Sequence, residues 1–455
     1  MSTIAAISTP HGVGGISIIR ISGDNAFFIC QKVFKSKSGI SISNMQGYTV
    51  HFGTVYDLEG NLIDEVLLTV FKAPNSYTAE NSIEISCHGG LTVSANVLNV
   101  VLSAGANMAL PGEFTKRAFL NGKIDLSRAE AVIDLINADS SINAKAAIWQ
   151  LEGAVSKKIE QIRQLLIEVN SEILAFVDYP DEDIADVSVK SLQPKLLKAR
   201  TYCEKLIKSF ESGSAIKDGI RCAIIGKPNA GKSSLMNILS KKEKSIVTHI
   251  AGTTRDIIED TVILGGIKLI LSDTAGVRDT KDIIEKLGVE KAFLEGQKSN
   301  LLLCVFDSNT KLTSEDLLVI EFAKDKKAIA VINKTDLDNM LNIELIKKSF
   351  KHIVYISALT GEGQLGLEKV ISEMFIDGSI SIENGELITN IRHKNCLNKA
   401  NVHIQNAINA LNNGTTFDAI SVDICEALCA LGEITGQTVN EQIIKDIFKR
   451  FCVGK

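Results

Sequence analysis

The sequence predicts a multidomain protein of combined α/β and α class. At 455 residues the chain is too long for one hydrophobic core, and about three domains are expected. Strand-like runs separated by turns fill residues 1–120, and strand and helix patterns alternate over 216–378. Helical patterns occupy 121–215 and 379–455, on either side of that alternating segment. We therefore expect an N-terminal mixed α/β domain and a helical domain into which a doubly wound α/β domain is inserted.

The N-terminal segment is expected to be rich in strands. Short apolar runs at Ile16–Ile21, Val66–Phe71 and Ile83–Ile85 alternate with turns that contain Gly, Asn and Pro. This pattern indicates a mixed domain but does not specify its topology.

The first helical segment is predicted from a cap and from apolar periodicity. Ser127 and Glu130 are spaced as a capping box, in which both side chains accept hydrogen bonds from backbone amides at the helix start. Apolar residues recur every three or four positions from Leu151 to Val177, which predicts a long amphipathic helix. A second helix is expected from about Leu192 to Phe210, ending at Glu211-Ser212-Gly213.

The segment between the helical flanks alternates strands and helices, as in a doubly wound parallel sheet. Its β-rich runs lie at Cys222–Ile225, Lys268–Leu271, Leu301–Phe306, Ala328–Ile332 and Ile353–Ile356. After Gly378 the pattern is helical again. Because neither flank is long enough to bury a large core alone, both are expected to form one helical domain that the sheet domain interrupts.

Composition argues against several classes of protein. The formal net charge of −5 provides no overall attraction to nucleic acid, so any RNA contact is expected to be a local patch. The nine cysteines include no CxxC pair, which suits a reducing cytosol, and Cys425 and Cys429 are expected to pack in a helical core. No apolar run approaches the roughly 18 residues of a membrane helix. We therefore expect a cytoplasmic protein without a membrane contact.

A phosphate-binding loop follows the first predicted strand of the inserted domain. Residues 226–233 read GKPNAGKS and match the pattern GxxxxGK[ST] between a strand and a helix. The glycines allow backbone amides to turn toward phosphates, Lys232 provides a positive charge for the β- and γ-phosphates, and the Ser233 hydroxyl can ligate Mg²⁺. The loop therefore predicts a nucleoside triphosphatase.

Two further stretches contain the residue types that contact Mg²⁺ and the γ-phosphate in nucleotide-binding loops. Asp273-Thr274-Ala275-Gly276 follows a predicted strand, which places a carboxylate beside Mg²⁺ and a glycine amide near the γ-phosphate. Upstream, Gly252-Thr253-Thr254 lies in a polar loop, and Thr254 can offer Mg²⁺ a second hydroxyl. Both stretches are candidate switch loops.

The stretch Asn333-Lys334-Thr335-Asp336 predicts which base is bound. The Asp336 carboxylate can accept hydrogen bonds from N1 and N2 of guanine, and adenine lacks these donors. A ligand without these donors would leave polar groups of the site unpaired and would bind weakly. GTP is therefore expected to be preferred over ATP. Ser357-Ala358-Leu359 is expected to close the base pocket. The inserted domain is therefore predicted to be a Ras-like P-loop GTPase domain.

The position after Gly276 departs from the small regulatory GTPases. It is Val277, where those proteins carry a glutamine that orients the attacking water, and valine cannot do so. Another group has to orient the water, and the best candidate is Glu285 at the start of a helix predicted over 285–299. An alternative of nearly equal weight is that Glu285 is only an acidic residue in the first turn, which the helix dipole favours.

Four signatures are spread along the whole chain. They are the stretches TPHGVGGISIIRISG, SIEISCHGG and LPGEFTKRAFLNGKIDLSRAEAVIDLI, in that order, and the final Cys452-Val453-Gly454-Lys455. Together they resemble the signatures of the MnmE (TrmE) family of bacterial and organellar tRNA-modification GTPases. The resemblance implies an N-terminal domain that binds a reduced folate, 5-formyl- or 5,10-methylene-tetrahydrofolate, and forms a homodimer. It also implies a helical domain that carries the GTPase as an insertion.

The resemblance further implies a potassium-activated GTPase in which two GTPase domains pair across their nucleotide faces. The K⁺ ion would replace an arginine finger and neutralise charge that develops during phosphoryl transfer. Glu285 would then be a catalytic residue that positions water. The implied K⁺ ligands are Asn229, Thr248, Ile250 and Thr253, and the implied Mg²⁺ ligands are Ser233 and Thr254. The implied GTP contacts are Asn229, Ala230, Gly231, Lys232, Ser233, Ser234, Thr248, His249, Ile250, Ala251, Gly252, Thr253, Thr254, Asp273, Thr274, Ala275, Gly276, Asn333, Lys334, Asp336, Ser357, Ala358 and Leu359. A turn residue without a ligand is the alternative interpretation of Asn229.

Four charged residues and one cysteine are implied to act in the N-terminal site. Arg20, Lys123 and Lys455 suit the glutamate tail of a folate, and Glu84 suits the paired donors of a pterin ring. From the sequence alone each of these is equally a surface charge. Cys452 is implied as a catalytic residue, because a thiolate can attack uridine or a folate intermediate.

The implied function is tRNA modification. With an FAD-dependent partner resembling MnmG (GidA), in a heterotetramer, such a protein takes part in forming the 5-carboxymethylaminomethyl-type, or a related aminomethyl, modification of the wobble uridine of certain tRNAs. GTP hydrolysis would drive its conformational cycle. The alternative is an Era-type GTP-dependent switch in ribosome assembly or RNA binding, which shares the GTPase loops. That alternative requires neither the folate stretch nor the terminal cysteine.

Overall fold

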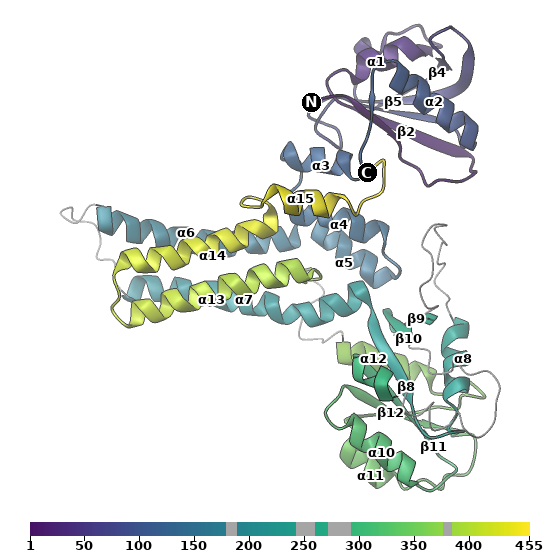
Figure 1. Ribbon diagram of the computed structural model, residues 1–455, viewed down its shortest axis with the longest axis vertical. Coiled ribbons are helices and arrows are strands. Elements are labelled where there is room, and N and C mark those ends of the chain that lie inside the picture. The colour runs from purple at the N-terminus through teal and green to yellow at the C-terminus, as the bar shows by residue number, and fades with distance from the viewer. Residues whose placement is uncertain (179–188, 243–259, 272–292, 376–384) are drawn as a thin grey trace. The chain divides into compact units, whose positions relative to one another are not determined.

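The computed structural model describes residues 1–178, 189–242, 260–271, 293–375 and 385–455 (Figure 1). The chain divides into two compact units, one of Met1–Ile133 with Leu428–Lys455 and the other of Asp134–Ala427. The first unit contains a mixed sheet, and the second contains long helices and a mostly parallel sheet. The predicted fold class, multidomain α/β plus α, is confirmed. The domain boundaries near 120, 215 and 378 stay predictions.

A seven-stranded sheet in the order β3-β4-β5-β6-β2-β1-β7 organises the first unit. Its strands are β1 (Ile4–Ile7), β2 (Ile16–Ser22), β3 (Phe34–Ser36), β4 (Thr49–Tyr56), β5 (Leu62–Phe71), β6 (Ser82–His88) and β7 (Asn107–Met108). Among these described strands, only β1 and β7 pair in parallel. The helices α1 (Ala26–Val33) and α2 (Leu91–Ser103) pack on one face and bury the residues of β2, β5 and β6 that face them. On the opposite face, Ile4 and Ala6 of β1 are buried with Phe114, whereas Ile16 of β2 and Leu67 of β5 are exposed.

Three further helices belong largely to the first unit: α3 (Glu113–Leu120), α4 (Leu126–Ile136) and α15 (Glu441–Phe448). The segment after α15 is held at the start of α3, because the amides of Gly112 and Phe114 donate to the carbonyls of Cys452 (3.3 Å) and Lys455 (3.2 Å). The Ser8 hydroxyl, just after β1, donates to the carbonyl of Gly454 (3.2 Å). The last residues of the sequence thus lie against β1 and α3.

The start of α4 corrects the predicted capping box. The amide of Arg128 and the hydroxyl of Ser127 both donate to Asp125 Oδ1, at 3.0 and 2.8 Å. Asp125 therefore caps the helix, and Ser127 already lies within it. The earlier start brings Leu126, which is fully buried, into the first turn.

Long helices form much of the second unit: α5 (Ser141–Leu151), α6 (Ala154–Asp178), α7 (Val189–Asp218) and α13 (Ile391–Asn412), with most of α14 (Phe417–Thr435). Both α6 and α13 pack along α7. The buried stripe of α6 confirms the predicted amphipathic helix and consists of Val155, Ile159, Ile162, Leu166, Val169 and Ile173. No described helix combines the length and apolarity needed to cross a membrane.

The predicted end of the second helix at Gly213 is wrong, because α7 continues to Asp218. A Cβ at Gly213 would collide with the carbonyl oxygen of Ile388. The amide of Ile388 also donates to the Ser209 hydroxyl on the same helix, at 3.0 Å. Gly213 therefore lets a neighbouring backbone approach the helix closely and does not terminate it.

The core-packing prediction for Cys425 and Cys429 is also wrong, because both side chains are exposed. The buried stripe of α14 runs through Ile420, Ile424 and Leu431. Residues 425 and 429 lie next to that stripe rather than on it, which a helical period of about 3.6 residues permits. Across the described ranges, no group of three His, Cys, Asp or Glu residues is placed to hold a metal ion.

A six-stranded sheet in the order β13-β12-β11-β8-β10-β9 completes the second unit. Its strands are β8 (Ile220–Ile225), β9 (Asp260–Leu264), β10 (Ile267–Leu271), β11 (Leu301–Asp307), β12 (Ala328–Asn333) and β13 (His352–Tyr355). All pair in parallel except β9, an edge strand that joins β10 through Gly265-Gly266. Strand β9 is not among the strands predicted from the sequence, although a Gly-Gly turn between two apolar runs is a hairpin signal.

Helices cover both faces of this sheet, which confirms the doubly wound arrangement. The helices α8 (Lys232–Lys242) and α12 (Gln364–Phe375) contribute to one core, and α10 (Ser314–Ala323) and α11 (Ile343–Ser349) to the other (Figure 1). Every residue of β11, between the two cores, is buried. The strand order reverses between β8 and β11, so the loops at their carboxyl ends form the edge where such sheets bind ligands.

Candidate functional site

The predicted phosphate loop joins β8 to α8 and depends on two glycines. A Cβ at Gly226 would collide with the Val305 carbonyl of β11, and one at Gly231 with the side-chain amide of Asn333. Gly231 also has a φ of +95°, a conformation that favours glycine. The loop can therefore approach both β11 and β12 only because these positions lack side chains.

Asn229 lies in the turn of this loop with a φ of +60°, which asparagine tolerates better than most residues. Its side chain is exposed, whereas the next residue, Ala230, is fully buried. The loop thus makes the Asn229 amide accessible to a ligand from solvent.

Lys232 begins α8, and its ammonium group lies across the loop. Lys232 Nζ donates to the carbonyls of Gly226 (2.9 Å) and Lys227 (2.7 Å). Ser233 and Ser234 are exposed in the first turn of the helix. Because the first amides of a helix have no partner within it, this turn is suited to binding phosphate, and the hydroxyls beside it can bind a metal.

The Asn333 side chain joins the loops that follow three parallel strands. Its Nδ2 donates to the carbonyl of Ala230 after β8 (2.9 Å), and its Oδ1 accepts from the amide of Ala358 after β13 (2.9 Å). Asn333 itself ends β12 and is 1% exposed. One buried amide therefore sets the spacing between the predicted phosphate loop and the predicted base loops.

Lys334 is held by a carboxylate that sequence analysis did not identify. Lys334 Nζ lies 2.6 Å from Asp307 Oδ2 at the end of β11, and the Ser308 hydroxyl donates to the Lys334 carbonyl (2.7 Å). Lys334 has a φ of +63°. These contacts support a backbone conformation that lysine rarely adopts.

Asp336 is exposed, but a buried hydroxyl orients its carboxylate. Ser357 Oγ donates to Asp336 Oδ1 (2.6 Å) and accepts from the amide of Thr360 (3.2 Å). Leu359 is exposed beside Ser357 and Ala358. The other Asp336 oxygen stays available to accept from a ligand, which is what recognition of guanine by this side chain would require.

Several predicted residues lie outside the described part of the chain. They are Thr248, His249, Ile250, Ala251, Gly252, Thr253, Thr254, Asp273, Thr274, Ala275, Gly276 and Glu285. The predicted switch loops and the predicted water-orienting residue therefore stay predictions.

In the first unit, Arg20 and Glu84 form an ion pair on adjacent strands. They are directly opposite each other in the antiparallel register of β2 and β6. Arg20 Nε and Nη2 lie 2.9 and 2.8 Å from Glu84 Oε1. The guanidinium carbon also lies 5.3 and 5.7 Å from the ring centroids of Tyr77 and Phe114. The pair is thus partly enclosed by aromatic rings, which sequence analysis did not identify.

Lys455 belongs to the same cluster. Burial, followed by the nearby Arg20 charge, lowers the pKa of the Lys455 ammonium group, while Glu84 and Cys452 act in the opposite direction. Burial also raises the pKa of the neighbouring Tyr77 hydroxyl, which exchanges a hydrogen bond with Thr115 (2.8 Å). Cys452 is exposed. The structure thus places Arg20, Glu84 and Lys455 near one another.

Lys123 is not joined to this cluster in the described structure. Its side chain is exposed, and within the described ranges no hydrogen bond or ion pair connects it with Arg20, Glu84 or Lys455. Sequence analysis also missed Arg117 on α3, which is 3% exposed and pairs with Glu80 (3.2 Å) and Glu113 (2.9 Å). The spacing of Glu113 and Arg117 by four residues was the available signal.

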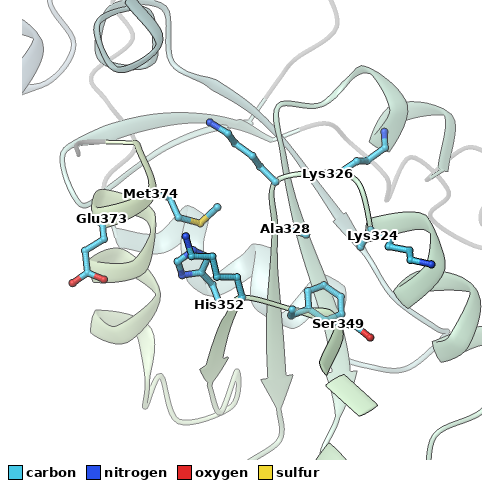
Figure 2. A pocket seen from close by; sticks show the side chains of 11 residues that line it. Lys324, Lys326, Ala328, Ser349, His352, Glu373 and Met374 are labelled. Atoms are coloured by element: carbon cyan, nitrogen blue, oxygen red, sulfur yellow. The ribbon is translucent and has the colours of Figure 1, made fainter. Parts of the chain in front are cut away.

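A separate cavity of about 460 Å³ lies away from the loops described above (Figure 2). It opens near the starts of β12 and β13, whereas the predicted nucleotide loops follow the ends of these strands. Four lysines line it, including Lys326, whose Nζ donates to the Gly296 carbonyl (3.0 Å), and Lys327, which pairs with Glu211. Its location excludes it from the predicted nucleotide site.

Known protein families and full-length relatives match both units of the chain. A family model described as the MnmE helical domain matches residues 126–452, and one described as the GTP-binding protein TrmE N-terminus matches residues 3–123. The tRNA modification GTPase MnmE of Lachnoclostridium phytofermentans is 47% identical over 100% of this chain and 99% of its own length. Those of Acetivibrio thermocellus and Clostridioides difficile are each 44% identical over the same shares.

A solved structure of Aquifex aeolicus Era resembles a smaller part of the chain. It is 30% identical and covers 34% of this chain and 56% of its own, with a TM-score of 0.25. The full-length relatives instead match the N-terminal unit, the helices and the sheet domain together. The chain therefore belongs to the MnmE family and is a GTP-hydrolysing enzyme of tRNA modification.

Proposed function

We propose that GTP and Mg²⁺ bind where the loops after β8, β12 and β13 meet. The described residues of this site are Asn229, Ala230, Gly231, Lys232, Ser233, Ser234, Asn333, Lys334, Asp336, Ser357, Ala358 and Leu359. The observation that carries the proposal is the Asn333 bridge, because it joins a loop suited to phosphate with a loop suited to guanine. Ser233 and Thr254 would ligate Mg²⁺, and residues 248–254 and Asp273 to Gly276 would contribute the contacts to the γ-phosphate.

Hydrolysis in this proposal depends on K⁺. Asn229, Thr248, Ile250 and Thr253 would ligate the ion where two GTPase domains pair, and Glu285 would orient the attacking water. Support comes from Val277, which cannot orient water, and from Asn229, whose amide is exposed on the left-handed turn of the phosphate loop. The cation supplies positive charge during phosphoryl transfer.

The test compares GTP turnover in KCl and NaCl at equal ionic strength. We expect faster turnover in KCl, and we expect Asn229→Ala to remove the difference without abolishing nucleotide binding. Asn237→Ala, which changes an exposed asparagine on α8, is the matched control and should retain potassium stimulation. Equal rates of the unmodified protein in the two salts would refute the potassium mechanism.

The N-terminal unit is proposed to bind a reduced folate, 5-formyl- or 5,10-methylene-tetrahydrofolate. Glu84 would accept from the pterin donors, and Arg20, Lys455 and Lys123 would attract the glutamate tail. The proposal is supported by the partly enclosed Arg20–Glu84 pair, the Tyr77 and Phe114 rings beside it, and the nearby Lys455 ammonium group. The exposed Cys452 thiol would then be available as a nucleophile.

The protein is further proposed to act as a homodimer that joins an FAD-dependent MnmG-like partner in a heterotetramer on tRNA in the cytoplasm. Support for the homodimer comes from the sheet of the first unit. Its face opposite α1 and α2 exposes apolar side chains on three strands, including Ile16, Val50, Phe52 and Leu67. A second copy would bury that face.

The proposed product is the 5-carboxymethylaminomethyl-type, or a related aminomethyl, modification of the wobble uridine of certain tRNAs. Nucleoside analysis of tRNA from cells that lack the protein tests it directly. We expect the modified wobble uridine to disappear and to return when the gene is restored. Unchanged wobble uridine together with defective ribosome assembly would instead support the Era-type alternative.

A further inference from the structure

Lys227, the second residue of the phosphate loop, has its ammonium group in a buried ion pair away from the loop. Lys227 Nζ lies 2.9 Å from Asp316 Oδ2 and 2.8 Å from the Thr310 hydroxyl. The exposed fractions of the Lys227 and Asp316 side chains are 11% and 1%. The two residues are 89 positions apart in the chain. The phosphate loop is thus tied to α10, an element that contributes no predicted nucleotide contact.

Asp316 is itself held in place by the start of α10. The amide and the hydroxyl of Thr313 both donate to Asp316 Oδ2 at 2.9 Å, and the amide of Asp316 donates to the Thr313 hydroxyl at 3.4 Å. This is a capping box with Thr313 at the N-cap. Asp316 Oδ1 is buried and has no hydrogen-bond partner among the described residues. Lys227 is therefore bound to a carboxylate that a helix end holds still.

The backbone of Lys227 contacts the predicted phosphate-binding lysine. The Lys227 carbonyl accepts from Lys232 Nζ at 2.7 Å and from the amide of Ala230 at 3.4 Å. Movement of residue 227 would therefore shift an acceptor of Lys232 and the turn that contains Asn229. The side-chain ion pair and these backbone contacts converge on one residue.

On the basis of the nucleotide site proposed above, we propose that Lys227 is a positioning residue for nucleotide binding, which holds the phosphate loop in its nucleotide-binding conformation through Asp316. A loop that is already ordered loses less conformational freedom when nucleotide binds. Removing one partner of a buried ion pair leaves the other charge unpaired, so the loop would move to expose it. The affinity for GDP and the affinity for GTP would both fall, because the loop amides contact phosphates that both nucleotides have.

Four variants test the proposal: Lys227→Met, Lys227→Arg, Asp316→Asn and the double variant K227M/D316N. Methionine keeps an unbranched side chain without charge, arginine keeps the charge, and asparagine keeps an acceptor for the Thr313 cap. Binding of fluorescent GDP and GTP analogues, and kcat and KM for GTP, are measured in the full chain. Lys311→Met is the control, because Lys311 is exposed in the connection that leads to α10.

We expect Lys227→Met and Asp316→Asn each to lower the affinity for GDP and for GTP about tenfold. The double variant should lose no more affinity than either single variant. KM should rise while kcat at saturating GTP changes little, as expected for loss of uniform binding. Lys227→Arg should recover most of the affinity, and Lys311→Met should behave as the unmodified protein.

Three results would overturn the proposal. In the first, the Lys227→Met melting temperature falls while nucleotide affinity is unchanged, which shows a purely structural role. In the second, the two single losses add in the double variant, which shows that the residues act independently. In the third, folded Lys227→Arg binds as weakly as Lys227→Met, which shows that the charge does not hold the loop.

Discussion

At the residue scale, the exposed Asp336 carboxylate is oriented by a neighbour that the base would not touch. Ser357 is fully buried, and its hydroxyl donates to one Asp336 oxygen at 2.6 Å. Because each carboxylate oxygen can accept more than one hydrogen bond, Asp336 can still accept from both N1 and N2 of guanine. Base preference in the proposed site therefore depends on a carboxylate whose direction the protein sets in advance.

Replacing Asp336 by Asn should change the base that is preferred. The side-chain amide of the variant would present a donor where guanine also presents a donor. A polar group left unpaired in this way costs about 1–3 kcal/mol, or about 5- to 150-fold in affinity. Binding of GTP should fall by this order, and xanthosine triphosphate, which has a carbonyl in place of the guanine amino group, should bind better. Equilibrium binding of both nucleotides measures the change. Asp338→Asn, at an exposed position two residues later, is the control. Unchanged GTP affinity of Asp336→Asn would place guanine elsewhere.

Lys455 provides a second test at this scale, because burial and Arg20 lower the pKa of its ammonium group. A lysine with a lowered pKa loses its proton at a lower pH than usual, and only the protonated form attracts a carboxylate. Folate affinity should therefore fall as the pH rises through this lowered pKa. Calorimetric titrations between about pH 7 and pH 10 measure it.

Lys455→Arg is the informative variant, because a guanidinium group stays protonated throughout this range. We expect it to remove most of the fall in folate affinity with pH. Lys35→Arg is the control, because Lys35 is an exposed lysine on β3 that is not among the proposed folate contacts, and it should keep the fall in affinity with pH. Identical pH profiles for all three proteins would exclude Lys455 from the folate site.

At the scale of elements, helix α7 shows how one glycine can join two segments far apart in the chain. Gly213 lies inside the helix with the Ile388 carbonyl against its Cα, and Ser209 accepts from the Ile388 amide one turn earlier. The chain enters α13 three residues after Ile388. The contact thus fixes how α13 begins along α7.

Changing Gly213 to Ala should destabilise the protein, although helix propensity alone favours alanine by about 1 kcal/mol. The added methyl group would collide with a backbone carbonyl, and such overpacking costs about 1–3 kcal/mol. The midpoint of thermal unfolding should therefore fall. Ser214→Ala, at the next position of the same helix, improves propensity without that collision and should not lower the midpoint. A stabilised Gly213→Ala protein would show that the carbonyl readily moves.

In the whole molecule, one face of the first unit's sheet is covered by α1 and α2, and the other face exposes apolar side chains on β4 and β5. The residues facing α1 and α2 form its main core, while Val50, Phe52 and Leu67 on the other face are exposed. These three lie on neighbouring strands, with Phe52 and Leu67 directly opposite each other. Contiguous apolar surface of this kind marks an interaction site.

Phe52→Glu should shift the protein from dimer to monomer, because a second copy would have to bury the new charge without a partner. Sedimentation at several protein concentrations measures the dissociation. Leu318→Glu on α10 is the control, because it also replaces an exposed apolar residue by glutamate, and it should leave the dimer intact. A monomeric unmodified protein, or a stable Phe52→Glu dimer, would contradict the proposed use of this face.

The local features of the chain could be predicted from its residues alone. A strand, a glycine-containing loop and a helix in close succession predict the phosphate loop, and apolar periodicity predicts α6 and the five parallel strands. These inferences hold because each depends on residues within a few turns of one another. They fail where two local caps compete, as Asp125 and Ser127 do for the start of α4. They also fail where a distant segment requires a glycine inside a helix, as Ile388 does at Gly213 of α7.

Contacts between residues far apart in the chain could not be predicted in this way, because they depend on how the elements pack. Arg20 faces Glu84 across 64 positions because of strand register, and Asn333 joins the loops after three strands because the sheet brings their carboxyl ends to one edge. Lys227 reaches Asp316 because helix α10 packs beside the phosphate loop. Register and helix packing follow from the burial of whole faces, a collective property that no short stretch of sequence contains.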